Sequence, residues 1–185
     1  YGQLVQLDPQ FGKSIDVDDG LVKLSWLILN KRAFVLHTAI DRLWFDWTYK
    51  QWQVRVGRQR INWGKALVWN PNDLFNAANY TDFDYEERPG SDAIKVAFYP
   101  TGMSDIEVAA KPGKKKNETV AAAMARFNKW GYDFQLIGGL YYTDIALGMG
   151  WAGNIKDAGF RGEASWFAGQ DGISGYAGTF SGTIG

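Results

Sequence analysis

The stretch Tyr132-Asp-Phe-Gln-Leu-Ile-Gly-Gly-Leu-Tyr-Tyr142 alternates between two kinds of side chain along nearly its whole length. One set of alternate positions is apolar or aromatic, and the other is mixed, with polar and small residues. The first set is Tyr132, Phe134, Leu136, Leu140 and Tyr142, and the second is Asp133, Gln135, Ile137, Gly139 and Tyr141. Because successive side chains of a β-strand point to opposite faces, this stretch predicts a strand with one apolar face.

The same alternation recurs in residues 145–152 and 160–166. Large apolar residues on one face, glycine or charge on the other and short turns between strands are typical of membrane-spanning β-barrels. We therefore predict an all-β fold: an antiparallel transmembrane β-barrel with an up-and-down meander of about ten strands. The glycine-rich end Ser181-Gly-Thr-Ile-Gly185 lacks the aromatic residue that commonly ends the last strand of such barrels, so we expect an incomplete barrel.

Composition narrows the class of protein. The chain has 185 residues, which suits one domain, and 20 basic residues balance 20 acidic ones, so no net field would attract nucleic acid. Cysteine is absent, which excludes a disulfide scaffold, thiolate metal sites and thiol nucleophiles. No apolar run approaches the roughly 20 residues of a transmembrane helix. The start Tyr1-Gly-Gln-Leu has neither the basic residues nor the apolar core of a signal peptide, as expected of a mature or partial chain.

The chain divides into segments with different expected roles. Residues 1–20 are polar and acidic, and we expect a periplasmic or plug-like segment. Residues 34–49 predict one long strand. Residues 64–90 predict a long folded loop, tucked into the lumen as a constriction, because loops of this length are usually functional or packed. Residues 120–129 are rich in alanine and fit either a helix or a strand.

Basic residues cluster on the strand before this loop. Three arginines fall between positions 55 and 60, and near the middle of a bilayer each would cost about 2–4 kcal/mol facing lipid. They are therefore expected to line the lumen, either in a salt-bridge network with Asp41, Asp46, Glu86 or Glu87, or as a filter for anionic solutes. The expected lumen residues are Arg42, Arg55, Arg58, Arg60, Lys95, Glu107, Arg126, Arg161 and Glu163.

The nine tryptophans lie mostly near expected strand ends, which favours aromatic girdles at the two membrane interfaces. A soluble β-sandwich that stacks sugars on surface aromatics is the alternative. No catalytic motif is present, and His37 is the only histidine. The acidic residues of 82–87 could supply oxygen ligands, but their spacing matches no EF-hand loop. We expect no enzyme activity, no metal and no cofactor.

Two runs carry a family resemblance: Val56-Gly-Arg-Gln-Arg-Ile-Asn-Trp-Gly64 and Trp69-Asn-Pro-Asn-Asp-Leu-Phe-Asn76. They resemble porin-like outer-membrane β-barrel proteins of Gram-negative bacteria of the Bacteroidota type. The resemblance implies a bacterial outer-membrane location, contact with the lipid bilayer and lipopolysaccharide, and passage of solutes, without catalytic residues. The leading expectation is passive diffusion of small hydrophilic solutes, with a bias toward anions. A plugged barrel that docks other envelope proteins is the competing expectation, and a soluble carbohydrate-binding β-domain is a weaker one.

Overall fold

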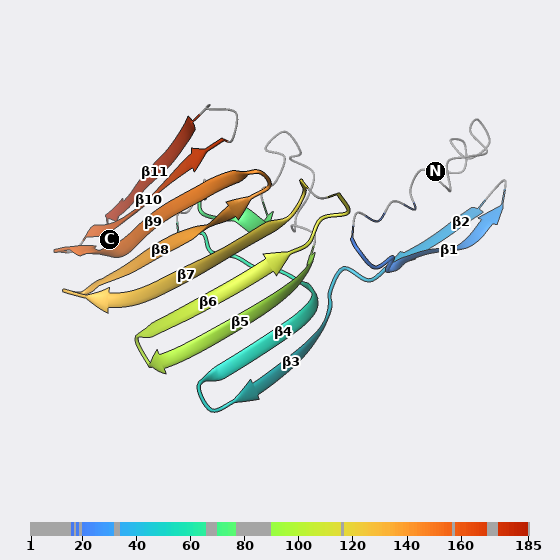
Figure 1. The fold of residues 1–185 in the computed structure, drawn as a ribbon, viewed down its shortest axis with the longest axis horizontal. Helices are drawn as coiled ribbons and strands as arrows, with labels where there is room; N and C mark the ends of the chain where they lie inside the picture. Colours follow the sequence, from blue (N-terminus) through green and yellow to red (C-terminus); the bar gives the residue numbers. More distant parts are fainter. Residues whose placement is uncertain are drawn as a thin grey trace.

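The computed structural model describes residues 16, 18, 20–31, 34–65, 70–76, 90–115, 117–156 and 158–169, together with the backbone of 174–184. These residues form antiparallel strands and one 3-10 turn, arranged in two sheets (Figure 1). The strands are β1 Ser25–Lys31, β2 Phe34–Ala39, β3 Leu43–Tyr49, β4 Trp52–Gln59, β5 Ser91–Thr101, β6 Ser104–Lys111, β7 Val120–Lys129, β8 Tyr132–Tyr141, β9 Asp144–Ile155, β10 Ala158–Ala168 and β11 Ser174–Ile184, and the turn η1 is Leu74–Asn76.

The topology is a meander. Strands β1 and β2 form a hairpin of their own, and the nine strands β3 to β11 lie side by side in chain order. All neighbouring pairs are antiparallel. The prediction of an all-β antiparallel meander is confirmed. The large sheet is open, however, with β3 at one edge and β11 at the other, so this structure does not contain the closed barrel.

The long strand expected over residues 34–49 is interrupted. Its first half, β2, pairs with β1, and its second half, β3, pairs with β4 in the other sheet. The interruption covers residues 40–42, where the adjacent charges of Asp41 and Arg42 break the alternation of apolar and polar residues. The backbone N–H of Ile40 donates to the Leu24 carbonyl at 2.8 Å, which holds the chain against the segment before β1.

The ambiguous residues 120–129 form strand β7. Alanine favours helices intrinsically, but here β6 and β8 pair with the segment along both edges. Its small side chains have a further effect, because Ala122 is buried beneath the loop that follows β4. Strand pairing and packing therefore override the local propensity.

The two faces of the large sheet differ sharply. One face, here named the apolar face, carries large hydrophobic side chains that are exposed in this chain. They include Phe45, Trp47, Val56, Ile94, Ile106, Val108, Leu136, Leu140, Ile145, Leu147, Met149 and Trp166. The opposite face, here named the covered face, carries alanine, glycine and polar residues, most of them buried or half-buried from β5 to β10.

The core lies on the covered face, beneath the loop after β4. Ile61, Trp63, Leu74 and Phe75 from this loop are buried against small and aliphatic side chains of the sheet. The sheet contributes Ala93, Ala109, Val120, Ala122, Met124, Ile137 and Ala146. Among the described residues, the sheet is thus apolar and mostly exposed on one side, and packed by its own loop on the other.

The two ends of the large sheet also differ. At one end, short turns follow β3, β5 and β7, and both residues of the Trp130–Gly131 turn have positive φ, as type I′ hairpins require. At the other end lie the segment before β3, the connection from 60 to 90 and the connection from 112 to 119, besides one short turn after β8. The longer connections therefore gather at a single end.

Candidate functional site

Charged side chains pair with one another along the covered face. On the first strands, Arg55 Nε donates to Asp46 Oδ2 at 2.7 Å, and Gln53 donates to the same carboxylate at 2.9 Å. The Arg55 guanidinium also lies 5.3 Å from the centre of the Trp44 ring, within cation–π range. The positive charge of Arg55 is therefore compensated by neighbouring groups on β3.

A second cluster spans β5, β6 and β7. Arg126 Nε donates to Asp105 Oδ1 at 2.9 Å, while Arg126 Nη2 donates to Glu107 Oε1 at 3.2 Å. Lys95 Nζ lies 3.7 Å from the same Glu107 oxygen. The hairpin of β5 and β6 was expected to bring Lys95 and Glu107 together, and it does. Because Glu107 is buried, these partners offset the free-energy cost of removing its charge from water.

The loop after β4 completes this cluster. Trp63 Nε1 donates to Glu107 Oε2 at 2.9 Å, and Gln135 Nε2 on β8 donates to the Trp63 carbonyl at 2.7 Å. The Trp63 and Phe75 rings meet edge to face, with 5.0 Å between their centroids. A single tryptophan thus joins the polar cluster to the apolar core.

Asn72 anchors the same loop farther across the sheet. Its Nδ2 donates to the Met149 carbonyl on β9 at 2.9 Å, and Ser165 Oγ on β10 donates to Asn72 Oδ1 at 2.7 Å. The Asn72 backbone N–H donates to Glu163 Oε2 at 3.3 Å, and the Lys65 backbone N–H donates to the other Glu163 oxygen. Glu163 is fully buried, so these donors satisfy a carboxylate that water does not reach.

The close approach of Asn72 depends on a glycine. A Cβ atom at Gly148 on β9 would overlap the Asn72 amide oxygen. At Gly150, two residues along the same face, a Cβ would lie 3.5 Å from Asn72 Nδ2, an ordinary contact. The glycine at 148 therefore allows the loop to lie close against the sheet.

A polar cavity of about 410 Å³ opens beside this loop, toward the end of the sheet that carries the short turns. Lys65, Asp105, Arg126 and Asp133 bring both signs of charge to its lining. Burial lowers the pKa of the Lys65 amine, and the nearby Asp133 carboxylate acts in the opposite direction. The cavity offers water and small polar molecules a mixed set of donors and acceptors.

Most of the expected lumen residues share the covered face. By strand register these are Arg55, Lys95, Glu107, Arg126, Arg161 and Glu163, of which Lys95, Glu107 and Arg126 come together directly. Arg42 lies before β3, where its Nε is 3.1 Å from Asp41 Oδ2, and Arg60 is exposed just after β4. Glu86 and Glu87, the other proposed partners, lie outside the described residues.

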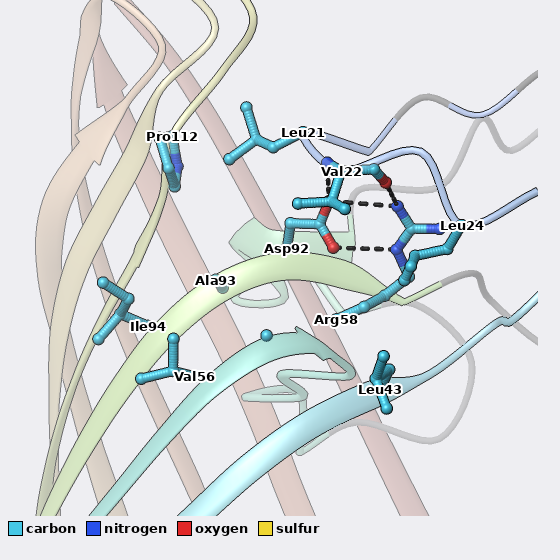
Figure 2. Close-up of a pocket in the computed structure, with 11 residues that line it drawn as sticks. Leu21, Val22, Leu24, Leu43, Val56, Arg58, Asp92, Ala93, Ile94 and Pro112 are labelled. Atoms are coloured by element: carbon cyan, nitrogen blue, oxygen red, sulfur yellow. Dashed lines mark hydrogen bonds and ion pairs between the residues drawn. The ribbon is translucent and has the colours of Figure 1, made fainter.

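Arg58 departs from the expectation, because it lies on the apolar face with Val56 rather than with Arg55. Its Nε donates to Asp92 Oδ1 at 2.9 Å, and its Nη2 donates to the Val22 carbonyl at 2.7 Å (Figure 2). The same Nη2 also donates to Asp18 Oδ1 at 2.9 Å. Strand alternation dictates this placement. Residues 18 and 20–24 cross over Arg58 and leave it 8% exposed, so the arginine pairs with acids rather than with solvent.

Four polar residues with structural roles here were not predicted from the sequence as site residues: Gln59, Asn72, Gln135 and Ser165. Gln59 Nε2 donates to the Ala93 carbonyl at 3.0 Å, and the others hold the loop as described above. Alternation had already placed Gln135 and Ser165 on the polar face, but it gave no sign of their contacts with the loop. Among the described residues, no three His, Cys, Asp or Glu side chains are grouped so that they could hold a metal ion. Nor does the described part of the chain contain a helix long and apolar enough to cross a bilayer.

Comparison with known proteins shows a family match over part of the chain. Residues 32–116 are similar to a family described as "Protein of unknown function (DUF1302)". This region runs from β2 through β6 and includes Arg58, Trp63 and the loop after β4. No curated protein and no solved structure matches the chain.

Proposed function

We propose that this chain forms part of the wall of a bacterial outer-membrane β-barrel, a porin-like channel for small hydrophilic solutes. The observation that carries the proposal is the apolar face. Hydrophobic side chains alternate with covered residues on successive strands, and they remain exposed although the opposite face is packed. Exposing so large an apolar surface to water is unfavourable, whereas contact with the hydrocarbon of a bilayer is not.

The covered face supports a passage. Its charges and amides are paired on the side away from the proposed lipid, and a solute could exchange part of its hydration for contacts with such groups without a covalent step. Because Arg55 and Arg126 are paired with carboxylates, the arginines contribute less bias toward anions than an unpaired row would. The preference for anions stays a prediction for ion-selectivity measurements.

The loop after β4 is proposed to narrow the passage. It contacts β5, β6, β8, β9 and β10 on the covered face, so any bore in the closed barrel would lie beside it. The alternative is a plugged barrel that acts as a docking subunit of a larger outer-membrane complex. The extensive buried hydrogen bonding of this loop favours that alternative over an open pore of full width.

Conductance of the full natural chain in planar bilayers tests these proposals. Gly148→Ala should push Asn72 and its loop away from β9 and increase single-channel conductance, while the matched variant Gly150→Ala should leave conductance unchanged. If Gly148→Ala conducts like the unsubstituted protein, the loop does not set the bore. If the protein inserts but neither it nor Gly148→Ala conducts, the channel proposal is wrong and the plugged subunit is supported.

A further inference from the structure

The polar cavity of about 410 Å³ beside the loop after β4 lies on the covered face, next to the turn that joins β5 to β6. Its volume is within the range of about 300–1,000 Å³ usual for ligand pockets. Lys65 lines it from the loop, and three charged side chains line it from the sheet: Asp105, Arg126 and Asp133. In outer-membrane barrels the short turns face the periplasm. In the proposed barrel this cavity therefore lies at the periplasmic mouth of the passage.

Two of these charges belong to a balanced network. Arg126 lies 2.9 Å from Asp105 and 3.2 Å from Glu107, and Lys95 lies 3.7 Å from the same Glu107 carboxylate. Two cations therefore face two carboxylates, and these four charges offset one another. The network accounts for Arg126 and Asp105, but for neither Lys65 nor Asp133.

Lys65 and Asp133 carry the charges that this network does not offset. Within the described part of the chain, the Lys65 amine has neither a hydrogen-bond acceptor nor an ion-pair partner. The Asp133 carboxylate accepts a hydrogen bond from Asn128 Nδ2 at 2.8 Å, but no described cation pairs with it. The Thr101 and Ser104 hydroxyls, which also line the cavity, bond to each other at 2.6 Å. The cavity thus presents one unpaired cation and one unpaired anion to the same space.

The loop after β4 determines where the Lys65 amine lies. The Lys65 backbone N–H donates to the buried Glu163 carboxylate, which holds the residue against the sheet. Burial lowers the pKa of the amine, whereas the carboxylates of Asp133, Asp105 and Glu163 oppose this effect and favour the charged form. Lys65 and Asp133 interact electrostatically without forming an ion pair, so the cavity space between them is open to a ligand.

We infer that this cavity binds a small zwitterion of the free amino acid class. The carboxylate of the ligand accepts a hydrogen bond from the Lys65 amine, and its ammonium group donates to the Asp133 carboxylate. A simple anion or a simple cation satisfies only one of these two residues, whereas a zwitterion satisfies both. The place of the cavity in a passage rests on the proposed function. There it acts as a subsite for solutes that carry both charges.

Binding of four solutes of nearly equal size to the full natural chain, purified in an uncharged detergent, tests this inference. L-Alanine carries both charges, lactate only the negative one, alaninamide only the positive one and lactamide neither. Saturation-transfer NMR at slightly acidic pH, where the amines are protonated and the carboxylic acids are ionised, gives each dissociation constant. Alanine should bind about 10-fold more tightly than lactate or alaninamide, since each of these lacks one charge-assisted hydrogen bond.

Variants of the two residues assign each contact. Lys65→Met should abolish the preference for alanine over alaninamide, because the ligand carboxylate loses its partner. Asp133→Asn should abolish the preference for alanine over lactate, because the ligand ammonium loses its partner. Two matched controls should rank the four solutes like the unsubstituted protein: Lys50→Met, at a short turn outside the cavity lining, and Asp144→Asn, at the opposite end of the sheet.

Three outcomes overturn the inference: the unsubstituted protein binds alanine no more tightly than lactate and alaninamide, the two cavity variants keep the ranking, or the controls lose it equally. The first of these comparisons requires no variant to fold. Conductance of the same samples in planar bilayers distinguishes this failure from failure of the proposed function. A conducting protein that does not prefer alanine contradicts only the subsite. A protein that prefers alanine but neither inserts nor conducts contradicts the channel proposal.

Discussion

Two positions on β9 offer a sharp test of what the apolar face contacts. Met149 and Ile155 lie on the same strand, by register on the same face, and have nearly equal exposure, 48% and 53%. In a soluble protein, arginine at either exposed position would change the free energy of unfolding by about 0.5 kcal/mol or less. The two substitutions would then be indistinguishable.

In a bilayer the two positions differ in depth. Their separation of six positions spans about 20 Å along the strand, which a tilt of roughly 40° reduces to about 15 Å of depth. With Met149 near the middle of an apolar band about 25 Å tall, Ile155 reaches the interface. Met149→Arg should therefore cost about 2–4 kcal/mol and Ile155→Arg only about 0–1 kcal/mol. Reversible guanidinium unfolding in lipid vesicles, followed by tryptophan fluorescence, measures both values. Equal costs below about 0.5 kcal/mol would refute the assignment of this face to hydrocarbon.

Two further predictions concern the ion pairs of Arg58. Arg58→Leu leaves Asp18 and Asp92 without their cationic partner and should lower the free energy of unfolding by about 3–5 kcal/mol in the same assay. Arg42→Leu, which removes a partly exposed ion pair, should lower it by about 1 kcal/mol or less. Similar losses in the two variants would contradict burial as the cause. Hydrogen bonds from Arg58 hold the pKa of the Asp18 carboxyl well below its usual range. The ionised Asp18 therefore stabilises the folded state fully above its ordinary pKa of 3.8, and this stabilisation is lost as the pH falls through the lower pKa of the folded state. Protection of the Leu24 amide, which donates to Asp18, should therefore decrease progressively below about pH 4 after correction for intrinsic exchange. Asp18→Asn should abolish that dependence, and an unchanged profile in this variant would assign the effect to another group.

Alternation predicted the faces of the strands because its period of two is a property of the backbone itself. That is why Gln135, Ile137 and Glu163 lie on the face that the pattern assigned to them. The same rule, applied strictly, would have separated Arg58 from Arg55. The expectation instead grouped them by charge, since sequence does not reveal that a distant segment carries Asp18 over the strand.

Other features depended on contacts that no local pattern encodes. The break between β2 and β3 follows from pairing with different partners, and the strand at 120–129 follows from neighbours on both edges. The loop was expected to fold inward, but its anchors were not. Asn72 meets Ser165 across 93 residues of sequence, and such a pairing leaves no periodic signal.

The span of that loop bears on how the protein assembles. Residues 61–65 and 70–75 precede β5 in the chain, yet their hydrogen-bond partners extend to β10. Asn72 can reach its final position only after β9 and β10 have joined the growing sheet, because Met149, Glu163 and Ser165 provide its contacts. Bringing together groups so distant in sequence is slow, since the chain entropy must be lost before the contacts form. Docking of the loop is therefore a late event that follows strand pairing, and until it occurs the face that the loop will cover stays hydrated.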